Sequence, residues 1–349
     1  DWLAANPASQ VKFERIEPDK DGNWINLTEN NWDELIPVAD MKTKAAKTKG
    51  QERAIFRLHS MGVVTARDEW VYDLNENSLL SKAMHLVERL EKQRNSQDTV
   101  FDPSIKWSEA LKNELRMDRG KLANPTTRIV AAAYRLFFRV KYYSERIFSD
   151  RLTDYHYAFF GNDLSAENYA VTTMGDPSGK PFFTMMIDRI PDLNFVSPAS
   201  GGTRTLPRYR YTKDGEKIDN ITDWALKQFR AAYGKPPSPL RGGIEDGGRE
   251  RSEPENTPTG SVPAMPGQSP ASPQGGGKKN AAISKDDIFH YVYGVLHDPI
   301  YREKYAINLK REFPRIPFYP DFWAWAAWGE KLMALHIGYE TVEPWPLER

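Results

Sequence analysis

The last part of the chain is rich in aromatic residues, and it follows a long stretch that cannot form a core. Lys235 to Asn280 contains nine Pro, nine Gly and almost no large apolar side chains. Such a composition buries too little apolar surface to offset the entropy of ordering the backbone. The aromatic sequence from Ile288 onward therefore has to pack on something earlier in the chain. We predict that 235–280 is a disordered Pro/Gly-rich insertion that interrupts one domain and does not separate two.

Helix start signals divide the C-terminal part of the sequence into short helices. Ser284 and Asp287 have the spacing of a capping box. Asp298 is followed by Pro299, a residue tolerated at the first position of a helix. Asp321 can cap a last helix that is rich in Trp. These signals predict a helical C-terminal subdomain.

The sequence before residue 220 mixes strand-like and helical patterns. Residues 11–72 and 168–186 carry short apolar runs broken by turn residues, which indicate strands. Residues 79–93 have apolar side chains at helical spacing. Residues 128–151 fit one buried helix or a helix that passes into a strand, and periodicity leaves both open. We expect an α+β fold, with a mixed or antiparallel sheet region followed by the helical subdomain.

Catalytic signatures are missing from the sequence. An amino-methyltransferase needs a Gly-rich loop after a strand and an Asn-Pro-Pro-aromatic tetrapeptide, and neither occurs. The absence of cysteine excludes disulfides, thiolate zinc sites and a cysteine nucleophile. The sequence therefore predicts no catalytic residue and no metal ligand in this chain.

Two alternative functions remain open at this point. Pro18-Asp19 together with Asp40 and Lys42 matches the bare pattern of a metal-dependent nuclease. Such a site requires carboxylates and a lysine that converge on Mg²⁺ from adjacent strands. The many aromatic residues would also suit a protein-binding adaptor, which needs a sizeable exposed apolar patch.

Basic residues are concentrated in two runs although the formal net charge is zero. Between Met41 and Arg57 there is one acid, Glu52, and the basic residues are Lys42, Lys44, Lys47, Lys49, Arg53 and Arg57. The second run has no acid and contains Arg204, Arg208, Arg210 and Lys213. Local basic faces of this kind can bind phosphates even when acids elsewhere cancel the total charge.

Five sequence blocks occur in the same order as in one protein family. They are SMGVVTARDEWVYDL (60–74), AAYRLFFRVKYYSER (132–146), RIPDLNFV (189–196), LPRYRY (206–211), and YVYGVLHDPIYREKYA (291–306) with its closing LHIGYE (335–340). Together they resemble the C-terminal specificity domain of type ISP restriction-modification enzymes, which are single-polypeptide relatives of the type I systems. One departure is Leu136, where the family usually has Pro.

The resemblance implies sequence-specific recognition of double-stranded DNA in a cytoplasmic phage-defence enzyme without a membrane segment. In that family the domain chooses the DNA sequence and presents the target adenine to an upstream methyltransferase module of the same chain. No cofactor is expected in this fragment, whereas S-adenosylmethionine, ATP and Mg²⁺ are expected in the upstream modules. Residues 1–75 are expected to be the trailing edge of the methyltransferase or the start of the recognition domain. Residues 76–234 form its α/β part and 281–349 its helical part.

If the resemblance holds for function, lysine and arginine side chains bind phosphates, and a few side chains contact base edges in the major groove. We expect the DNA-binding residues near the ends of these blocks, where no compensating acid is evident in the sequence. The predicted residues are Arg135, Arg139, Lys141, Arg204, Arg208 and Arg210. Arg204 follows Gly201 and Gly202, where the backbone can approach DNA closely.

Overall fold

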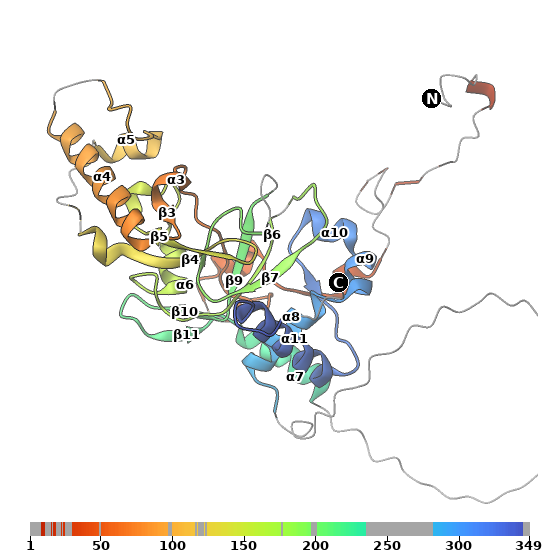
Figure 1. Cartoon of the computed structure of the whole chain (residues 1–349). Helices are drawn as coiled ribbons and strands as arrows, with labels where there is room; N and C mark the ends of the chain where they lie inside the picture. Colours follow the sequence, from red (N-terminus) through yellow and green to blue (C-terminus); the bar gives the residue numbers. More distant parts are fainter. Residues whose placement is uncertain are drawn as a thin grey trace, which may run out of the picture.

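The computed structural model describes residues 30–234 and 282–344, apart from gaps at 49, 97–99, 116, 118–121, 123, 176 and 197–200, and a few isolated residues before 30. The predicted insertion at 235–280 lies outside the described residues. Helices α4 and α5 lie at one end of the molecule and α7 to α11 at the other, with the sheets between them (Figure 1).

The helices are α2 (Met41–Ala45), α3 (Asp68–Val71), α4 (Glu76–Arg94), α5 (Glu109–Leu115), α6 (Asp154–Phe160), α7 (Asp223–Tyr233), α8 (Lys285–Val295), α9 (Pro299–Lys304), α10 (Ala306–Arg311) and α11 (Phe322–Ile337). The strands are β1 (Ile36–Pro37), β2 (Ser60–Met61), β3 (Tyr72–Asp73), β4 (Ile129–Arg135), β5 (Phe138–Tyr143), β6 (Ala170–Met174), β7 (Thr184–Ile187), β8 (Ile190–Pro191), β9 (Thr203–Pro207), β10 (Tyr209–Tyr211), β11 (Lys217–Asp219) and β12 (Arg315–Ile316).

The first four-stranded sheet, of order β2-β9-β6-β7, is antiparallel and forms the central layer. Successive side chains of a strand point to opposite faces. Val171 and Leu206 accordingly belong to the core shared with the C-terminal helices, whereas Ala170 and Met185 belong to a second core on the other face. Both faces of this sheet are therefore buried.

The second four-stranded sheet, of order β3-β5-β4-β8, is mixed, because β4 runs antiparallel to β5 but parallel to β8. Leu79 and Leu86 of α4 pack in the same core as Tyr142 and Tyr143 of β5. The helical alternatives for residues 128–151 are wrong, because this segment is a hairpin whose turn has Phe137 at a φ of 54°.

The C-terminal helices begin where their capping residues predict. The Ser284 and Asp287 side chains form the reciprocal capping box, and the Asp298 carboxylate accepts a hydrogen bond from the Ile300 amide. Helices α8 and α11 pack closely at two glycines. A Cβ atom on Gly329 would lie 1.8 Å from the His290 carbonyl oxygen, so only glycine allows this approach.

The helical subdomain packs back on the sheet, which confirms the expected α+β architecture. The Tyr293 hydroxyl of α8 accepts a hydrogen bond of 2.8 Å from the Met186 amide of β7. At the other side of the core, β1 and β12 pair antiparallel, with Ile36 opposite Ile316. Segments from both ends of the chain thus share one core. Among the described residues, no helix is long and apolar enough to cross a membrane.

Candidate nucleic-acid interface

The six predicted DNA-binding residues fall into two groups. Arg135, Arg139 and Lys141 lie on the β4–β5 hairpin. Arg204, Arg208 and Arg210 lie on or between β9 and β10. Contrary to the expectation that no acid compensates them, the fold brings acids from distant parts of the sequence to most of these cations.

Arg135 fixes the hairpin to the loop after β8. Its guanidinium donates to the Asp192 carboxylate at 2.7 Å and lies 3.5 Å from the carboxylate of Asp68. It also stacks over the Tyr134 ring, 3.7 Å from the ring centroid. Burial raises the pKa of Asp192, and the hydrogen bond from the Asn194 amide and the charge of Arg135 offset this only partly. Arg135 is therefore one of the groups that stabilise the charged form of this buried carboxylate.

Arg139 closes the end of helix α11. It donates to the Ile337 carbonyl oxygen at 2.6 Å and to the Glu340 carboxylate at 2.8 Å. A cation at a helix C-terminus satisfies its last carbonyl groups and interacts favourably with the helix dipole. Lys141 differs, because its pair with Glu76 at 2.9 Å joins two side chains that are 43% and 60% exposed. An exposed pair of this kind is weak and easily exchanged for another anion.

Arg208 is buried between two segments. Its guanidinium donates to Asp219 of β11 and to Asp286 of α8, each at 2.6 Å. Arg210 lies on β10, which pairs with β11, and its guanidinium donates two hydrogen bonds, of 3.2 and 3.1 Å, to the Asp219 backbone carbonyl oxygen. Arg208 thus joins the sheet region to the first turn of the C-terminal helices.

Arg204 lies at the end of the central sheet, beside two interlocked loops. Gly201 and Gly202 have φ values of 67° and 72°, in the left-handed region that favours glycine. A Cβ atom on Gly175 would lie 1.8 Å from the Gly201 carbonyl oxygen, so the loops before β7 and β9 touch backbone to backbone. The Ser178 amide ties the first of these loops to α10. Arg204 itself is half-buried and lies over the Phe313 ring.

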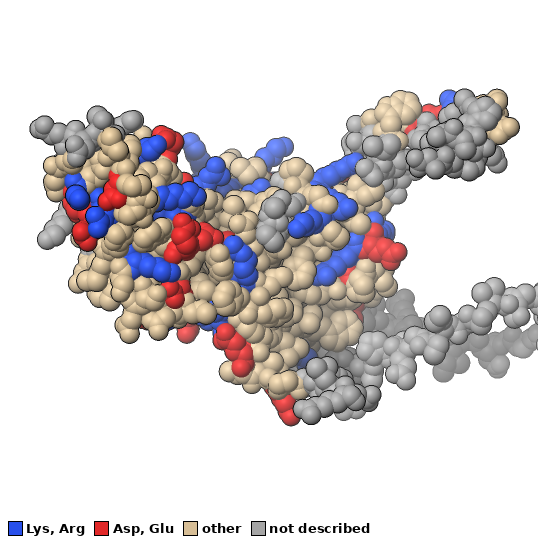
Figure 2. Space-filling model, turned by 45° about the horizontal axis from the view of Figure 1, so that its top comes forward, with Lys and Arg blue, Asp and Glu red and all other residues tan. Residues whose placement is uncertain are grey.

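Lysine and arginine side chains are spread over one broad face of the molecule. Figure 2 shows them from the α4 end to the α9–α10 end, with acidic side chains in smaller groups between them. Such a face suits an extended polyanion, because each cation can neutralise one phosphate and release a counterion. It provides no metal-dependent or nucleophilic chemistry by itself.

A family model for the type ISP C-terminal specificity domain matches residues 54–349. The chain belongs to this family. None of the curated proteins matches it.

Solved structures of type ISP and related enzymes resemble this specificity domain over nearly its whole length. A DrdV–DNA complex determined by electron cryo-microscopy is 37% identical, with a TM-score of 0.77 over 99% of this chain and 30% of that one. A nuclease-deletion mutant of the type ISP enzyme LlaGI with a DNA substrate mimic is 23% identical, with a TM-score of 0.66 over 97% of this chain and 26% of that one.

The ATP-dependent type ISP enzyme LlaBIII bound to DNA is 21% identical, with a TM-score of 0.69 over 94% of this chain and 18% of that one. This chain therefore spans less than a third of the length of each of these structures. The last two similarities, at low identity, establish the shared fold.

The positions of Asp40 and Lys42 in the structure exclude the nuclease alternative. Asp40 is the N-cap of α2, and its carboxylate accepts hydrogen bonds from the Thr43 amide at 2.6 Å and the Thr43 hydroxyl at 2.8 Å. Lys42 is exposed on the same short helix. The two residues do not lie on adjacent strands, which the nuclease site requires. Asp19 lies outside the described residues.

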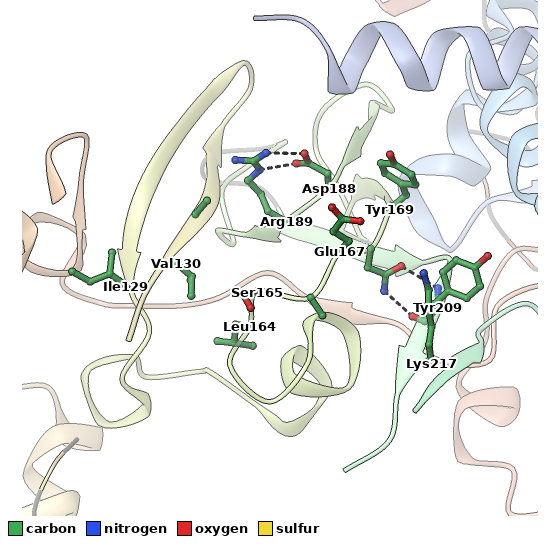
Figure 3. Close-up of a pocket in the computed structure, with 13 residues that line it drawn as sticks. Ile129, Val130, Leu164, Ser165, Glu167, Tyr169, Asp188, Arg189, Tyr209 and Lys217 are labelled. Atoms are coloured by element: carbon green, nitrogen blue, oxygen red, sulfur yellow. Dashed lines mark hydrogen bonds and ion pairs between the residues drawn. The ribbon is translucent and has the colours of Figure 1, made fainter. Parts of the chain in front are cut away.

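A cavity of about 520 Å³ lies between the hairpin and the segment before β6 (Figure 3). Ile129, Val130 and Leu164 give it an apolar side. Asp188 and Arg189 at its rim form a bidentate pair with distances of 2.6 and 2.7 Å. Because its charged groups include both signs in equal measure, the cavity has no preference for an anion.

Lys44 is a cation that the sequence prediction did not select. It lies beside Arg204, and its ammonium group donates to the His59 carbonyl oxygen at 2.8 Å. The signal was present in the basic run from Met41 to Arg57, but nothing in the sequence indicates that this run meets β9.

Proposed function

We propose that this chain recognises a specific sequence of duplex DNA and presents the target adenine to an upstream methyltransferase module of the same polypeptide. The observation that carries the proposal is membership of the specificity-domain family over residues 54–349. The 37% identical DrdV structure, which aligns with 99% of this chain, is a complex with DNA. The broad basic face gives the electrostatic surface that DNA binding requires.

Within this proposal the end of the central sheet is the part that meets the DNA. Arg204 stands there on β9 beside the glycine loop, where the backbone leaves room for a close approach. Lys141 can exchange its exposed partner for a phosphate. Arg135, Arg139 and Arg208 hold internal ion pairs, so we assign them mainly to shaping the surface. A DNA-binding role for all six residues stays a prediction.

Catalysis belongs, in this proposal, to modules outside the chain. S-adenosylmethionine would serve the methyltransferase, and ATP with Mg²⁺ would serve the restriction motor. This chain contributes sequence choice, because contacts to base edges specify a site whereas contacts to phosphates position the duplex. A protein-binding adaptor is the weaker candidate, since family membership points to DNA.

The proposal is tested by joining this chain to the methyltransferase part of a related type ISP enzyme. Methylated adenines are then mapped by sequencing the DNA of cells that express the hybrid. We expect a motif that differs from that of the parent enzyme, whose own specificity domain serves as the control. A motif that follows the methyltransferase part and ignores this chain overturns the proposal.

A further inference from the structure

The two basic runs of the sequence lie side by side in the structure. Arg57 donates to the carbonyl oxygens of Thr43, Lys44 and Ala46, which closes the C-terminal end of α2. The Arg57 amide in turn donates to the Asn220 carbonyl oxygen at 2.7 Å, next to β11. Helix α2 is thereby held against the β9–β11 region, although about 160 residues separate them in sequence.

Lys44 and Arg204 both lie close to His59, next to this contact. The Lys44 ammonium group lies 3.9 Å from the centroid of the Tyr155 ring and donates to the His59 carbonyl oxygen. Arg204 lies over the Phe313 ring, whose centroid is 4.6 Å from that of the buried His59 ring. Aromatic rings and a backbone carbonyl therefore position both cations.

Two positive charges act on the buried His59. Burial and then the charge of Arg204 lower the pKa of Lys44. Burial, followed by the charges of Lys44 and Arg204, lowers the pKa of His59 to about 3, and Asp40 opposes this as the smallest of the four effects. An anion placed between Lys44 and Arg204 would relieve their mutual repulsion.

A basic hollow of about 760 Å³ continues from α2 toward β10. Its acidic residues are Glu52, Asp219 and Asp223, and its basic residues are Lys47, Arg53, Arg57, Arg210, Lys227 and Lys285. Burial and then the charge of Arg57 lower the pKa of Arg210, although Asp219 and Glu52 oppose this. The Lys285 ammonium group forms ion pairs with the carboxylates of Asp219 and Asp223, at 3.3 and 2.7 Å. The hollow therefore keeps an excess of positive charge.

The two ends of this surface are separated by a length that suits a nucleic-acid backbone. Arg204 on β9 and Arg210 on β10 are six residues apart in sequence, so their Cα atoms are at most roughly 20 Å apart. This corresponds to about six base pairs of duplex, at roughly 3.4 Å per phosphate along each strand. The separation between the two arginines is therefore within the length of one short stretch of duplex.

We propose that α2 and the residues that follow it form, with β9 and β10, a track for the phosphate backbone, in which Lys44 and Arg204 hold one phosphate between them. The inference rests on the proposed function and extends it. It gives a DNA-binding role to residues before residue 54, where the family match begins. A phosphodiester fits this pair because its two free oxygens can accept one charged donor each.

The test measures binding of labelled duplexes by fluorescence anisotropy over a range of KCl concentrations. One duplex carries the motif found by methylation mapping, and the other carries a scrambled sequence. The variants are Lys44→Gln, Arg204→Gln and the double substitution. Lys331→Gln, at an exposed position on α11, is the matched control that also removes one positive charge.

We expect Lys44→Gln to weaken binding of both duplexes about tenfold, the loss typical of a hydrogen bond to a charged group. The slope of log affinity against log salt should fall by about 0.9, as for one lost phosphate contact. The double substitution should lose less than the two single losses combined, because both cations hold the same phosphate. Lys44→Arg, which keeps the charge, should restore most of the affinity.

Several results would overturn this inference. One is an affinity and salt slope of Lys44→Gln equal to those of Lys331→Gln, with unchanged melting temperatures. Another is a loss confined to the duplex with the motif, which would make Lys44 a base contact. A third is unchanged DNA binding with weaker association to the methyltransferase module, which would make the surface a protein interface.

Two results distinguish failure of this inference from failure of the proposed function. If the methylated motif still follows this chain, only the inference fails. If the unsubstituted chain binds neither duplex, the proposed function fails with it.

Discussion

At the scale of single residues, Arg208 is a predicted DNA-binding cation that stabilises the fold through ion pairs. Its side chain is 6% exposed and bridges Asp219 and Asp286. We predict that Arg208→Met lowers the free energy of unfolding by about 2–3 kcal/mol, less than for a fully buried pair because both carboxylates reach solvent. Urea denaturation measures this. Lys141→Met, which breaks only the exposed pair with Glu76, should cost under about 1 kcal/mol. Equal losses in the two variants would contradict the prediction.

His59 gives the protein a pH dependence of known sign. It is 1% exposed, and burial together with Lys44 and Arg204 lowers its pKa to about 3. Between about pH 6.5 and 3 the unfolded chain binds a proton that the folded chain excludes, so this contribution to stability is present above pH 6.5 and lost on acidification. We predict that the free energy of unfolding of His59→Leu rises relative to that of the unsubstituted protein as the pH falls below 6. The difference should grow by at most about 1.4 kcal/mol per pH unit. Parallel stability curves from urea denaturation at pH 7, 6 and 5 would refute this.

At the scale of elements, the contact between α8 and α11 depends on the absence of side chains. Alanine normally stabilises the interior of a helix by about 1 kcal/mol relative to glycine. At Gly329 the added Cβ would meet the His290 carbonyl oxygen at 1.8 Å, and the two helices would have to separate. We predict that Gly329→Ala destabilises the protein by about 3 kcal/mol, as overpacking does.

The control for this prediction lies on the same helix. Ala334 is exposed on α11, so Ala334→Gly should cost only the helix propensity of about 1 kcal/mol. Thermal unfolding followed by circular dichroism compares the two variants. A neutral or stabilising effect of Gly329→Ala would show that the helices are packed less closely than the structure indicates.

At the scale of the whole molecule, the segment before the family match is part of the core. Trp32, Ile36 and Val38 are buried among the C-terminal helices, and β1 pairs with β12. Burying each such side chain contributes roughly 1.5–3 kcal/mol, against a total stability of about 5–15 kcal/mol for a domain. We predict that a chain beginning at residue 54 loses cooperative unfolding, whereas the full 349-residue chain keeps it. Differential scanning calorimetry distinguishes the two, and a cooperative transition in the shorter chain would contradict the prediction.

Local sequence determined the helix starts of this protein. Ser284, Asp298 and Asp321 cap the helices that they predict, because a cap needs only backbone amides two or three residues away. The α+β architecture and the family followed from periodicity and from sequence blocks that are likewise contiguous. The sequence of the β4–β5 hairpin does not distinguish helix from strand, because a buried apolar run has no period that separates the two structures.

Only the tertiary structure decided which charges meet. Arg135, Arg208 and Arg139 each have a carboxylate partner far away in sequence, at separations of 57, 78 and 201 residues respectively. The electrostatic effect of Arg204 on Lys44 depends in the same way on how α2 is held against the sheet. Strand order and helix packing set these pairings, and both are long-range properties that charge patterns along the chain do not encode. Composition therefore indicated that basic surfaces exist, while the fold selected the cations that face outward.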